Sequence, residues 1–534
     1  MDTNTQSDHL LAPDGSQPAP MPRTQPRSES EASTPDPART PDPAPTSVLG
    51  GAVVGVIVGS AILRLALAAF VTHFVLVDDA YIHLRYARNL WTTGDFVYNA
   101  GEPVFGLTSP LFGLLCTVLY GLFGSHVAIA VTTLNVALWT GVSVLAARTL
   151  PASVRLPLIA LICLAPVFVD NQLLGMESAL FALVLMGSLG CALSGRTSNA
   201  AAWYGVALIT RPEAVLLAPV LLWAASRREG LQAAVRKLVQ PRTLMLLVGP
   251  GILWCVRAMN TYGTIVPQSM VAKTGWNNDH YDGLFGLKGA LLAVPRLTLI
   301  PFVDYFPGAV AWSLTAGVIA SVGYVIRANV SRGNATSRAW LGFYLIYVAF
   351  YVAGKGATEA SWYAVPSSLA FLMAAMPALP AWTRKPAVGW AFVVGLAGVS
   401  FVAAQKRAPL LQSYVDGYGA SALYLENMRN DEKVVIGEIG IFGFHSSHPV
   451  VDVGALVSPE VLPWKNDGFS FCRIVQESGA RWFVISDVAV ESNAYPSVGQ
   501  VWSDDTERAW FEACTHVAQH ADKRTYAIPA EHRD

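Results

Sequence analysis

Long apolar runs separated by short polar loops fill the chain from residue 48 to residue 404. A helix needs about 20 apolar residues to cross the hydrocarbon core of a bilayer, and most of these runs come close to that length. Hydrophobic residues make up 53% of the sequence and charged residues only 14%, which excludes an ordinary soluble enzyme. We therefore expect an α-helical polytopic membrane protein with about eleven transmembrane helices. The runs lie at 48–70, 108–124, 126–147, 155–170, 175–194, 200–225, 243–259, 307–327, 339–354, 362–380 and 387–404.

The basic residues predict how the chain crosses the membrane. The formal net charge is −1, so the chain as a whole does not attract nucleic acid. Loops rich in Arg and Lys mark the cytoplasmic side of a membrane protein, and three such loops agree with one another. Counting spans from them places Asp78, Asp79, the loops at 260–285 and 355–361 and the C-terminus on the extracytoplasmic face, with a cytoplasmic N-terminus. The basic residues of the three loops are Arg227, Arg228, Arg236, Lys237, Arg242, Arg327, Arg332, Arg338, Arg384 and Lys385.

Composition divides the chain into three parts. Residues 1–47 are rich in Pro, Ser and Thr and too poor in apolar residues to form a core, which predicts a disordered cytoplasmic tail and not a cleaved signal peptide. Residues 48–404 form the predicted transmembrane domain. From 405 to 534 the pattern is that of a soluble α/β domain, which we expect outside the membrane. Its predicted strands lie at 434–437, 450–453 and 482–485, with a helix at 471–478.

The six cysteines include no CxxC pair and no Cys/His cluster with the spacing of a metal site. Four of them lie in apolar runs, where a small buried hydrophobic side chain is the simpler interpretation. Cys472 and Cys514 lie in the predicted extracytoplasmic domain, where a disulfide between them is allowed but not required. No resident metal site is predicted, and a divalent cation remains open as a cofactor.

The first predicted extracytoplasmic loop, residues 71–107, is too polar to lie in lipid. Asp78 and Asp79 begin a segment that is predicted to be helical up to Leu90. Both acids together could cap this helix, although a cap needs only one carboxylate. Because adjacent carboxylates repel each other, we expect one of the two pKa values to be raised, which suits a general base.

Cations follow on the same predicted helix. Arg85 and Arg88 are three residues apart and share a face, where their guanidinium groups could hold a phosphate. Two arginines that face lipid headgroups are an equally good interpretation. His83 is the weaker candidate, since a histidine at a membrane interface is often only solvated.

Two more polar features lie near the same predicted face. Lys273 follows the span at 243–259 and offers a cation to an anionic leaving group. Trp362 and Tyr363 open a later span, either as part of an aromatic belt at the interface or as contacts for a substrate.

Charged residues also interrupt the apolar runs. Arg211 and Glu213 flank Pro212 inside one run, where a lone charge costs roughly 2.5–3.5 kcal/mol. We expect a helix break at the proline and a charged partner for each residue, and this break has either a structural or a functional role. Glu177 also interrupts an apolar run, and its role is likewise either structural or functional.

These motifs resemble the GT-C superfamily of polytopic glycosyltransferases, which includes protein O-mannosyltransferases, aminoarabinose transferases and mycobacterial arabinofuranosyltransferases. The likeness covers residues 75–275, and the later part of the chain resembles the family more loosely. Ala100 and Ser178 stand where many relatives carry proline and threonine, which are mild departures. The matching motifs are Asp78-Asp79-Ala80-Tyr81-Ile82, Arg85-Tyr86-Ala87-Arg88-Asn89, Asn99-Ala100-Gly101-Glu102-Pro103, Thr108-Ser109-Pro110, Gly175-Met176-Glu177-Ser178, Thr210-Arg211-Pro212-Glu213 and the segment from Tyr262 to Lys273.

The resemblance implies transfer of a hexose or pentose, with inversion, from a polyprenyl-phosphate carrier to an acceptor hydroxyl of the cell envelope. It places the reaction on the outer face of a bacterial plasma membrane, with a glycan, glycolipid or protein as acceptor. Asp78 or Asp79 would be the catalytic base. The residues implied in binding the donor phosphate are Arg85, Arg88, Lys273 and His83. Those predicted to bind substrate are Tyr81, Glu102, Tyr262, Gln268 and Tyr363.

Two other functions are compatible with the sequence. A lipid or envelope-precursor transporter would also have many spans and charges within the membrane such as Arg211, although no inverted repeat relates the two halves. A non-catalytic envelope scaffold is the third possibility, and it predicts that neither Asp78 nor Asp79 lines a cavity. The C-terminal domain either recognises the acceptor or shields the cavity.

Overall fold

The computed structural model describes residues 49–275, 287–301, 303, 306–353, 360–428 and 432–529. The predicted disordered tail, residues 1–47, lies outside the described residues. The chain from Ala44 to Asp534 forms one compact unit.

Six helical segments among the described residues are long and apolar enough to cross a membrane, and Ser178–Leu193 is a shorter apolar helix. Apolar side chains also point outward from these helices. Leu253 is 74% exposed and Val394 is 72% exposed, as expected for helices that face lipid. The chain is therefore a polytopic membrane protein, and the predicted number of about eleven spans stays a prediction. The six segments are Gly51–Phe70, Pro110–Thr149, Ala152–Leu173, Pro241–Tyr262, Gly308–Arg332 and Pro386–Asn427.

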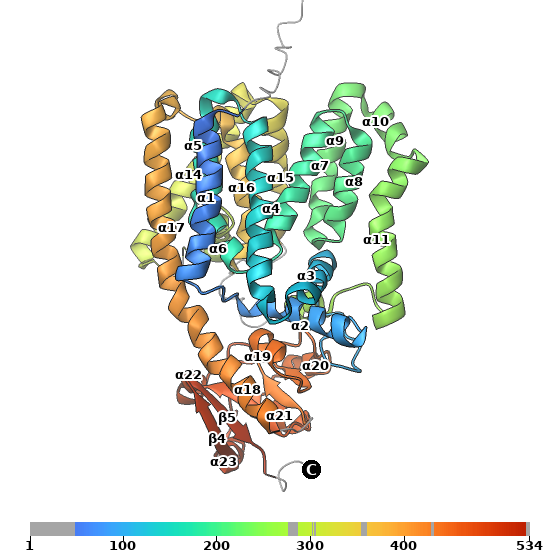
Figure 1. Ribbon diagram of the computed structural model, residues 1–534, viewed down its shortest axis with the longest axis vertical. Helices are drawn as coiled ribbons and strands as arrows, with labels where there is room; N and C mark the ends of the chain where they lie inside the picture. The colour runs from blue at the N-terminus through green and yellow to red at the C-terminus, as the bar shows by residue number, and fades with distance from the viewer. Residues whose placement is uncertain are drawn as a thin grey trace, which may run out of the picture. The chain divides into compact units, whose positions relative to one another are not determined.

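Figure 1 shows most of these helices packed side by side in one bundle, with α2 and α3 between the bundle and the C-terminal domain. The helices in the first half are α1 Gly51–Phe70, α2 Asp78–Thr93, α3 Pro110–Phe123, η1 Gly124–His126, α4 Val127–Thr149, α5 Ala152–Leu164, α6 Pro166–Leu173, α7 Ser178–Leu193, α8 Thr197–Leu208, η2 Pro212–Leu217, α9 Ala218–Glu229, α10 Leu231–Leu238 and α11 Pro241–Tyr262. They are followed by α12 Gln268–Gly275, α13 Leu287–Arg296, α14 Gly308–Arg332, α15 Ala335–Ala353, η4 Ser361–Tyr363, α16 Ala364–Ala374, η5 Met376–Ala378, η6 Ala381–Arg384 and α17 Pro386–Tyr414.

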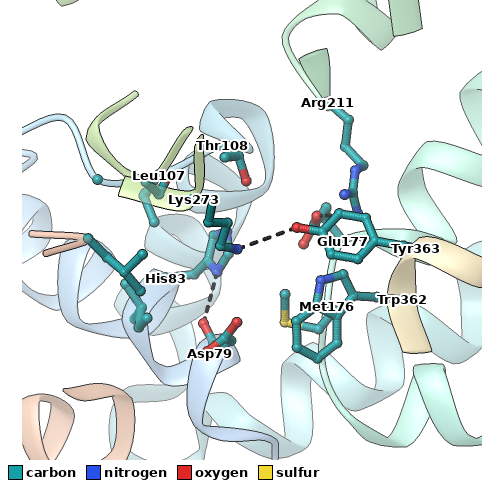
Figure 2. Close-up of a pocket in the computed structure, with 14 residues that line it drawn as sticks. Asp79, His83, Leu107, Thr108, Met176, Glu177, Arg211, Lys273, Trp362 and Tyr363 are labelled. Carbon is teal, nitrogen blue, oxygen red and sulfur yellow. Dashed lines mark hydrogen bonds and ion pairs between the residues drawn. The ribbon is translucent and has the colours of Figure 1, made fainter. Parts of the chain in front are cut away.

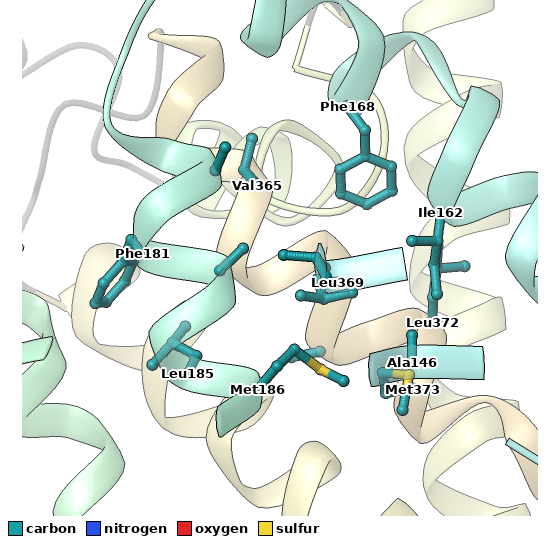
Figure 3. Packing of buried hydrophobic residues seen from close by; sticks show 14 of the residues in the cluster. Ala146, Ile162, Phe168, Phe181, Leu185, Met186, Val365, Leu369, Leu372 and Met373 are labelled. Atoms are coloured by element: carbon teal, nitrogen blue, oxygen red, sulfur yellow. The ribbon is translucent and has the colours of Figure 1, made fainter. Parts of the chain in front are cut away.

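The core of the bundle is formed by side chains from α4, α5, α6, α7 and α16. Figure 3 shows Phe168, Phe181 and Leu369, from three of these helices, in one cluster of hydrophobic side chains, and all three are fully buried. Trp139 of α4 is also fully buried, and its indole N–H donates to the carbonyl of Ile162 at 2.9 Å, which satisfies its one polar group.

The apolar run at 200–225 is broken where the sequence predicts. Helix α8 ends at Leu208, and the 3-10 helix η2 begins at Pro212, whose missing N–H is suited to a helix start. This break places the buried Arg211 in the non-helical connection and Glu213 in the first turn of η2. The expectation of two shorter helices in place of one long span is confirmed.

The C-terminal domain is built on a five-stranded sheet with the order β2-β1-β3-β5-β4. The first three strands are parallel and match the three predicted strands, and β4 and β5 are antiparallel. The predicted helix at 471–478 is α21, and Ser470 caps it. Cys472 and Cys514 are both buried free thiols. The elements are η7 Val415–Gly419, α18 Ala420–Asn427, β1 Val434–Ile436, α19 Ile439–His445, β2 Val450–Asp452, α20 Val461–Asn466, α21 Phe471–Glu477, β3 Trp482–Ser486, α22 Asp487–Ser492, α23 Asp505–Ala513, β4 Thr515–His520 and β5 Lys523–Ala527.

Helix α19 joins the domain to the bundle by packing directly on α2 (Figure 1). Two of its glycines make this close approach possible. A Cβ atom on Gly440 would lie 1.7 Å from the carbonyl oxygen of Asp78, and one on Gly443 would lie 1.9 Å from the Tyr98 hydroxyl. Side chains at either position would push the two helices apart.

Candidate active site

A pocket lies at the end of the bundle that faces the C-terminal domain, and α2 forms one of its walls (Figure 2). Its free space is about 40 Å³, which is room for about three water molecules. Acids, cations and aromatic side chains converge on it from segments that are far apart in the sequence. The lining residues are Asp79, Ile82, His83, Gly106, Leu107, Thr108, Met176, Glu177, Arg211, Ser269, Lys273, Trp362, Tyr363 and Leu456.

Helix α2 contributes Asp79, Ile82 and His83, which lie on one face because they are three and four residues apart. The Asp79 side chain is half-buried. His83 Nδ1 lies 3.4 Å from the Asp79 carbonyl oxygen, and its Nε2 is buried without a hydrogen-bond partner among the described residues. Burial lowers the pKa of His83, so its ring is neutral at pH 7 and offers a hydrogen bond, not a charge.

Lys273 of α12 enters the pocket beside Tyr363. Its Nζ donates to the Tyr363 hydroxyl at 3.4 Å and lies 5.9 Å from the centre of that ring (Figure 2). Its contact with Tyr363 is the largest effect on Lys273 and raises the pKa of its amine. Lys273 is therefore a cation in a largely enclosed site, where its field is screened less than at an open surface.

Arg211 forms the opposite wall in a buried ion-pair network. One guanidinium nitrogen lies 2.9 Å from Glu177 Oε1, and the other lies 2.8 Å from Glu213 Oε1. Arg211 also lies 4.9 Å from the centre of the Tyr363 ring. The other carboxylate oxygen of Glu177, Oε2, is buried without a hydrogen-bond partner in the described part of the chain. The sequence predicts a charged partner for Arg211 and for Glu213. The two residues pair with each other, and Arg211 also pairs with Glu177.

Asp78 does not line this pocket. Its two carboxylate oxygens accept hydrogen bonds from the backbone N–H groups of Gly440 at 2.7 Å and Ile441 at 2.8 Å, at the start of α19. The N-cap of α2 itself is Val77, and no side chain caps it. The interpretation of Asp78 and Asp79 as two caps of their own helix is therefore wrong, and Asp78 instead binds the start of a helix in the C-terminal domain.

The raised pKa expected for one of the adjacent acids belongs to Asp78. Burial is the largest cause, and it raises the pKa of Asp78 from 3.8 to about 7, with a smaller contribution from the charge of Asp79. Burial together with Asp78 raises the pKa of Glu438 from 4.5 to about 8. These two neighbouring acids lie between α2 and the C-terminal domain, and not in the pocket.

Arg85 and Arg88 share a face of α2, as the sequence predicts, but this face is turned away from the pocket. Arg85 donates to the carbonyls of Tyr98 at 2.9 Å and Gly443 at 2.5 Å. Arg88 donates to the carbonyls of Phe444 at 2.6 Å and Ser446 at 2.9 Å. Both guanidinium groups thus bind backbone oxygens at the end of α19, where cations are favourable.

The other predicted substrate contacts surround the pocket without lining it. Tyr81 is buried against Phe444, with ring centres 5.6 Å apart, and Glu102 accepts from Asn99 at 2.7 Å. Tyr262 stacks on a neighbouring aromatic ring, and the Gln268 amide donates to the Ala455 carbonyl at 3.1 Å. Of the predicted site residues, the structure brings together Asp79, His83, Lys273 and Tyr363.

Glu177 and Arg211 line the pocket, although they are not among the site residues predicted from the sequence. The signal is their charge within apolar segments, since such residues usually face a cavity or a partner. Among the described residues, no group of three or more His, Cys, Asp or Glu side chains is arranged to hold a metal ion.

Comparison with solved structures identifies the fold. The structure of ArnT from Cupriavidus metallidurans bound to undecaprenyl phosphate superposes with a TM-score of 0.58 at 15% identity, covering 91% of this chain and 100% of that one. The apo form of the same protein superposes with a TM-score of 0.58 at 14% identity, covering 90% of this chain and 98% of that one. The oligosaccharyltransferase of Archaeoglobus fulgidus has a TM-score of only 0.47 at 12% identity, covering 82% of this chain and 70% of that one. The chain therefore has the fold of ArnT, and identity this low says nothing about its chemistry.

Sequence comparison adds one match. Residues 411–528 match the family described as Domain of unknown function (DUF8728), which covers the C-terminal domain. No curated protein matches the chain in sequence.

Proposed function

We propose, because the chain has the GT-C fold of the membrane glycosyltransferases, that it transfers a sugar from a polyprenyl-phosphate carrier to an acceptor hydroxyl. The observation that carries this proposal is the pocket itself, where the Asp79 carboxylate faces the same small space as the cations Lys273 and Arg211. A transfer from a phosphate leaving group needs both a base and a positive charge, and this pocket offers both.

Asp79 is the proposed catalytic base. Its carboxylate takes the proton of the acceptor hydroxyl as that oxygen attacks the anomeric carbon, and the bond from this carbon to the phosphate oxygen breaks. A single displacement of this kind inverts the anomeric configuration. Asp78 is excluded from the role in this proposal because both of its oxygens already accept backbone hydrogen bonds outside the pocket.

Lys273 is the proposed main contact of the leaving phosphate. It is charged and largely enclosed, it donates a hydrogen bond to the Tyr363 hydroxyl, and the charge of Asp79 lies near it. Arg211 also faces the pocket, but its charge is offset by the carboxylates of Glu177 and Glu213. The undecaprenyl phosphate bound to ArnT supports the same class of carrier for this chain.

Donor hydroxyl groups are the proposed partners of the two unsatisfied polar atoms, Glu177 Oε2 and His83 Nε2. Trp362 and Tyr363 offer aromatic faces beside them. Arg85 and Arg88 are assigned to holding α19, in place of the phosphate-binding role that the family resemblance implies.

The pocket faces the extracytoplasmic side in this proposal, because the three basic loops predict the opposite ends of the spans to be cytoplasmic. The C-terminal domain contributes Leu456 to the pocket lining, so it both shields the pocket and borders the path of an acceptor. The donor could carry a hexose or a pentose, and the acceptor is a hydroxyl of an envelope glycan, glycolipid or protein.

The test is sugar transfer from a panel of radiolabelled polyprenyl-phosphate sugars in membranes that contain the wild type, Asp79→Asn or Asp78→Asn at matched protein levels. We expect transfer by the wild type, its loss in Asp79→Asn and partial retention in Asp78→Asn. Equal activity of Asp79→Asn and the wild type would remove Asp79 as the base. Absence of transfer from every donor would instead favour a transporter, which uptake of the same labelled lipids into vesicles would then detect.

A further inference from the structure

The proposed mechanism leaves one buried hydroxyl of the Asp79 pocket without a role. Ser269 is the second residue of α12 and lines the pocket, and only 5% of its surface is exposed. Its Oγ joins Glu177 Oε2 and His83 Nε2 as a buried polar atom of this pocket without a hydrogen-bond partner among the described residues. A buried hydroxyl normally has a partner, so Ser269 is a candidate contact for a bound ligand.

Helix α12 presents Ser269 to the pocket together with Lys273. The two residues are four positions apart, so their side chains lie one turn apart on the same face of the helix. The adjacent face contacts the C-terminal domain. There the Gln268 amide donates to the Ala455 carbonyl at 3.1 Å, and Ala272 is fully buried in the core of that domain. These contacts fix the rotation of α12 and direct Ser269 toward the pocket.

The start of α12 is also held by the loop that precedes α3. The backbone N–H of Gln268 donates to the Phe105 carbonyl at 2.6 Å, and the next residues of that loop, Gly106 and Leu107, line the pocket. The neighbour of Ser269 in the chain is therefore bound from two sides. A hydroxyl held in this way is ordered before the ligand arrives, so its hydrogen bond costs little additional entropy on binding.

Lys273 indicates which kind of ligand atom this hydroxyl meets. A phosphate group presents several oxygens and can accept from two donors that lie about 5.4 Å apart, the rise of one helical turn. Hydrogen bonds to a charged acceptor are shorter and stronger than those between neutral groups, and the Lys273 amine beside Ser269 favours such an acceptor. A neutral sugar hydroxyl would gain less from the same pair of side chains.

We propose that the Ser269 hydroxyl donates a hydrogen bond to a phosphate oxygen of the polyprenyl-phosphate carrier, beside Lys273. The identity of this ligand rests on the proposed function. When the bond from the anomeric carbon to the phosphate oxygen breaks, its electron pair stays on that oxygen and the phosphate takes up a second negative charge. The hydrogen bond from Ser269 therefore strengthens during the reaction, and it contributes both to carrier binding and to stabilisation of the leaving group.

The test measures binding and transfer separately, with the full-length protein in a neutral detergent. Binding is measured by the rise in the unfolding midpoint during titration with undecaprenyl phosphate, and undecaprenol is the phosphate-free arm. Transfer is measured as kcat/KM for the best donor of the sugar panel. Ser269→Ala removes the hydroxyl, and Ser269→Thr keeps it. The matched control is Ser421→Ala, because Ser421 of α18 is also buried with no hydroxyl partner among the described residues but does not line the pocket.

We expect Ser269→Ala to weaken undecaprenyl phosphate binding about tenfold and to lower kcat/KM by about tenfold or more, the effect of one hydrogen bond to a charged group. Ser269→Thr should retain most of both, and Ser421→Ala should match the wild type. Any stabilisation by undecaprenol should be the same in all four proteins. Unfolding midpoints without lipid show whether each variant is folded. Ser269→Cys, which has a similar size and a much weaker donor, replaces Ser269→Ala if that variant is not.

Wild-type affinity of Ser269→Ala for undecaprenyl phosphate would overturn the proposal, and a lower kcat/KM at unchanged affinity would show that the hydroxyl contacts the sugar instead. An equal loss in Ser421→Ala would also overturn it, because the loss of any buried hydroxyl would then explain the result. Binding that depends on Ser269, without sugar transfer by the wild type, would support this inference and contradict the proposed function. Absence of undecaprenyl phosphate binding by the wild type would contradict both.

Discussion

The carboxylate of Asp78 binds the backbone of Gly440, 362 residues further along the chain, with a hydrogen bond of 2.7 Å. A second bond to the next N–H group completes the contact, and the absence of a side chain on Gly440 lets the two helices approach. The two adjacent acids therefore make different contacts. Asp78 attaches the C-terminal domain to α2, and Asp79 is left to face the pocket.

Replacing Asp78 should loosen the C-terminal domain. Asp78→Ala leaves two buried N–H groups without acceptors, which should destabilise the contact by about 1–3 kcal/mol for each group. Limited proteolysis, followed by electrophoresis, measures this as faster cleavage that separates the domain from the bundle. Asp79→Ala is the matched control and should be cleaved at the wild-type rate, and equal rates in all three proteins would contradict the assignment of Asp78.

Gly440→Ala should disrupt the same contact by a steric route. Its Cβ atom would lie 1.7 Å from the Asp78 carbonyl oxygen, so α19 must move, at a cost of about 1–3 kcal/mol. The thermal unfolding midpoint in detergent measures the loss. Gly395→Ala lies in α17 with open space around its Cβ and should keep or raise the midpoint. A lower midpoint in both variants to the same extent would show that glycine replacement in general, and not this contact, is responsible.

The contact between the bundle and the C-terminal domain should depend on pH. Folding raises the pKa of Asp78 from 3.8 to about 7 and that of Glu438 from 4.5 to about 8, mainly through burial. The folded state therefore binds protons more tightly than the unfolded state. The contribution of the two acids to stability is complete below the unfolded pKa values and is lost as the pH rises through about 7 to 8.

The unfolding midpoint should accordingly fall between about pH 5 and pH 8, and Glu438→Gln should reduce this slope because one titrating group is removed. Glu460→Gln, at an exposed acid of the same domain, is the control and should keep the full slope. An unchanged slope in Glu438→Gln would mean that other groups cause the pH dependence.

Lys273→Gln should weaken donor binding. It removes the cation proposed to hold the phosphate while keeping a side chain of similar length, and losing a charged hydrogen bond corresponds to an increase of about tenfold or more in the donor KM. Initial rates over a range of donor concentrations measure it. Lys385→Gln, at an exposed lysine at the start of α17, should behave as the wild type. An unaltered donor KM in Lys273→Gln would show that Lys273 does not contact the donor phosphate.

Arg211→Leu should be among the most destabilising single changes in the bundle. It would leave the carboxylates of Glu177 and Glu213 buried without a cation, which costs about 3–5 kcal/mol. The thermal unfolding midpoint is the measurement, with Arg332→Leu at an exposed position as control. Adding Glu213→Gln to Arg211→Leu should recover part of the loss, and a double variant no more stable than the single one would contradict the network.

Sequence periodicity by itself determined the architecture. The apolar runs predicted a helical membrane protein, and the change from apolar runs to short strands predicted the α/β domain. Pro212 predicted the helix break at Arg211. These features are local, because burial of apolar surface and the missing proline N–H act within a few residues of the chain. The three predicted strands are observed as β1, β2 and β3.

Only the tertiary structure decided which charged residues share the pocket. Asp78 and Asp79 are neighbours with the same chemistry, and a helix turns consecutive side chains by 100°, so packing sends one to α19 and the other to the pocket. The packing of α19 directs Arg85 and Arg88 onto backbone carbonyls. The pocket also gathers Glu177, Arg211 and Lys273 from three separate segments. Contacts between residues hundreds of positions apart leave no periodic signal in one sequence, which is why the acid-base and phosphate roles could be narrowed only after the fold was known.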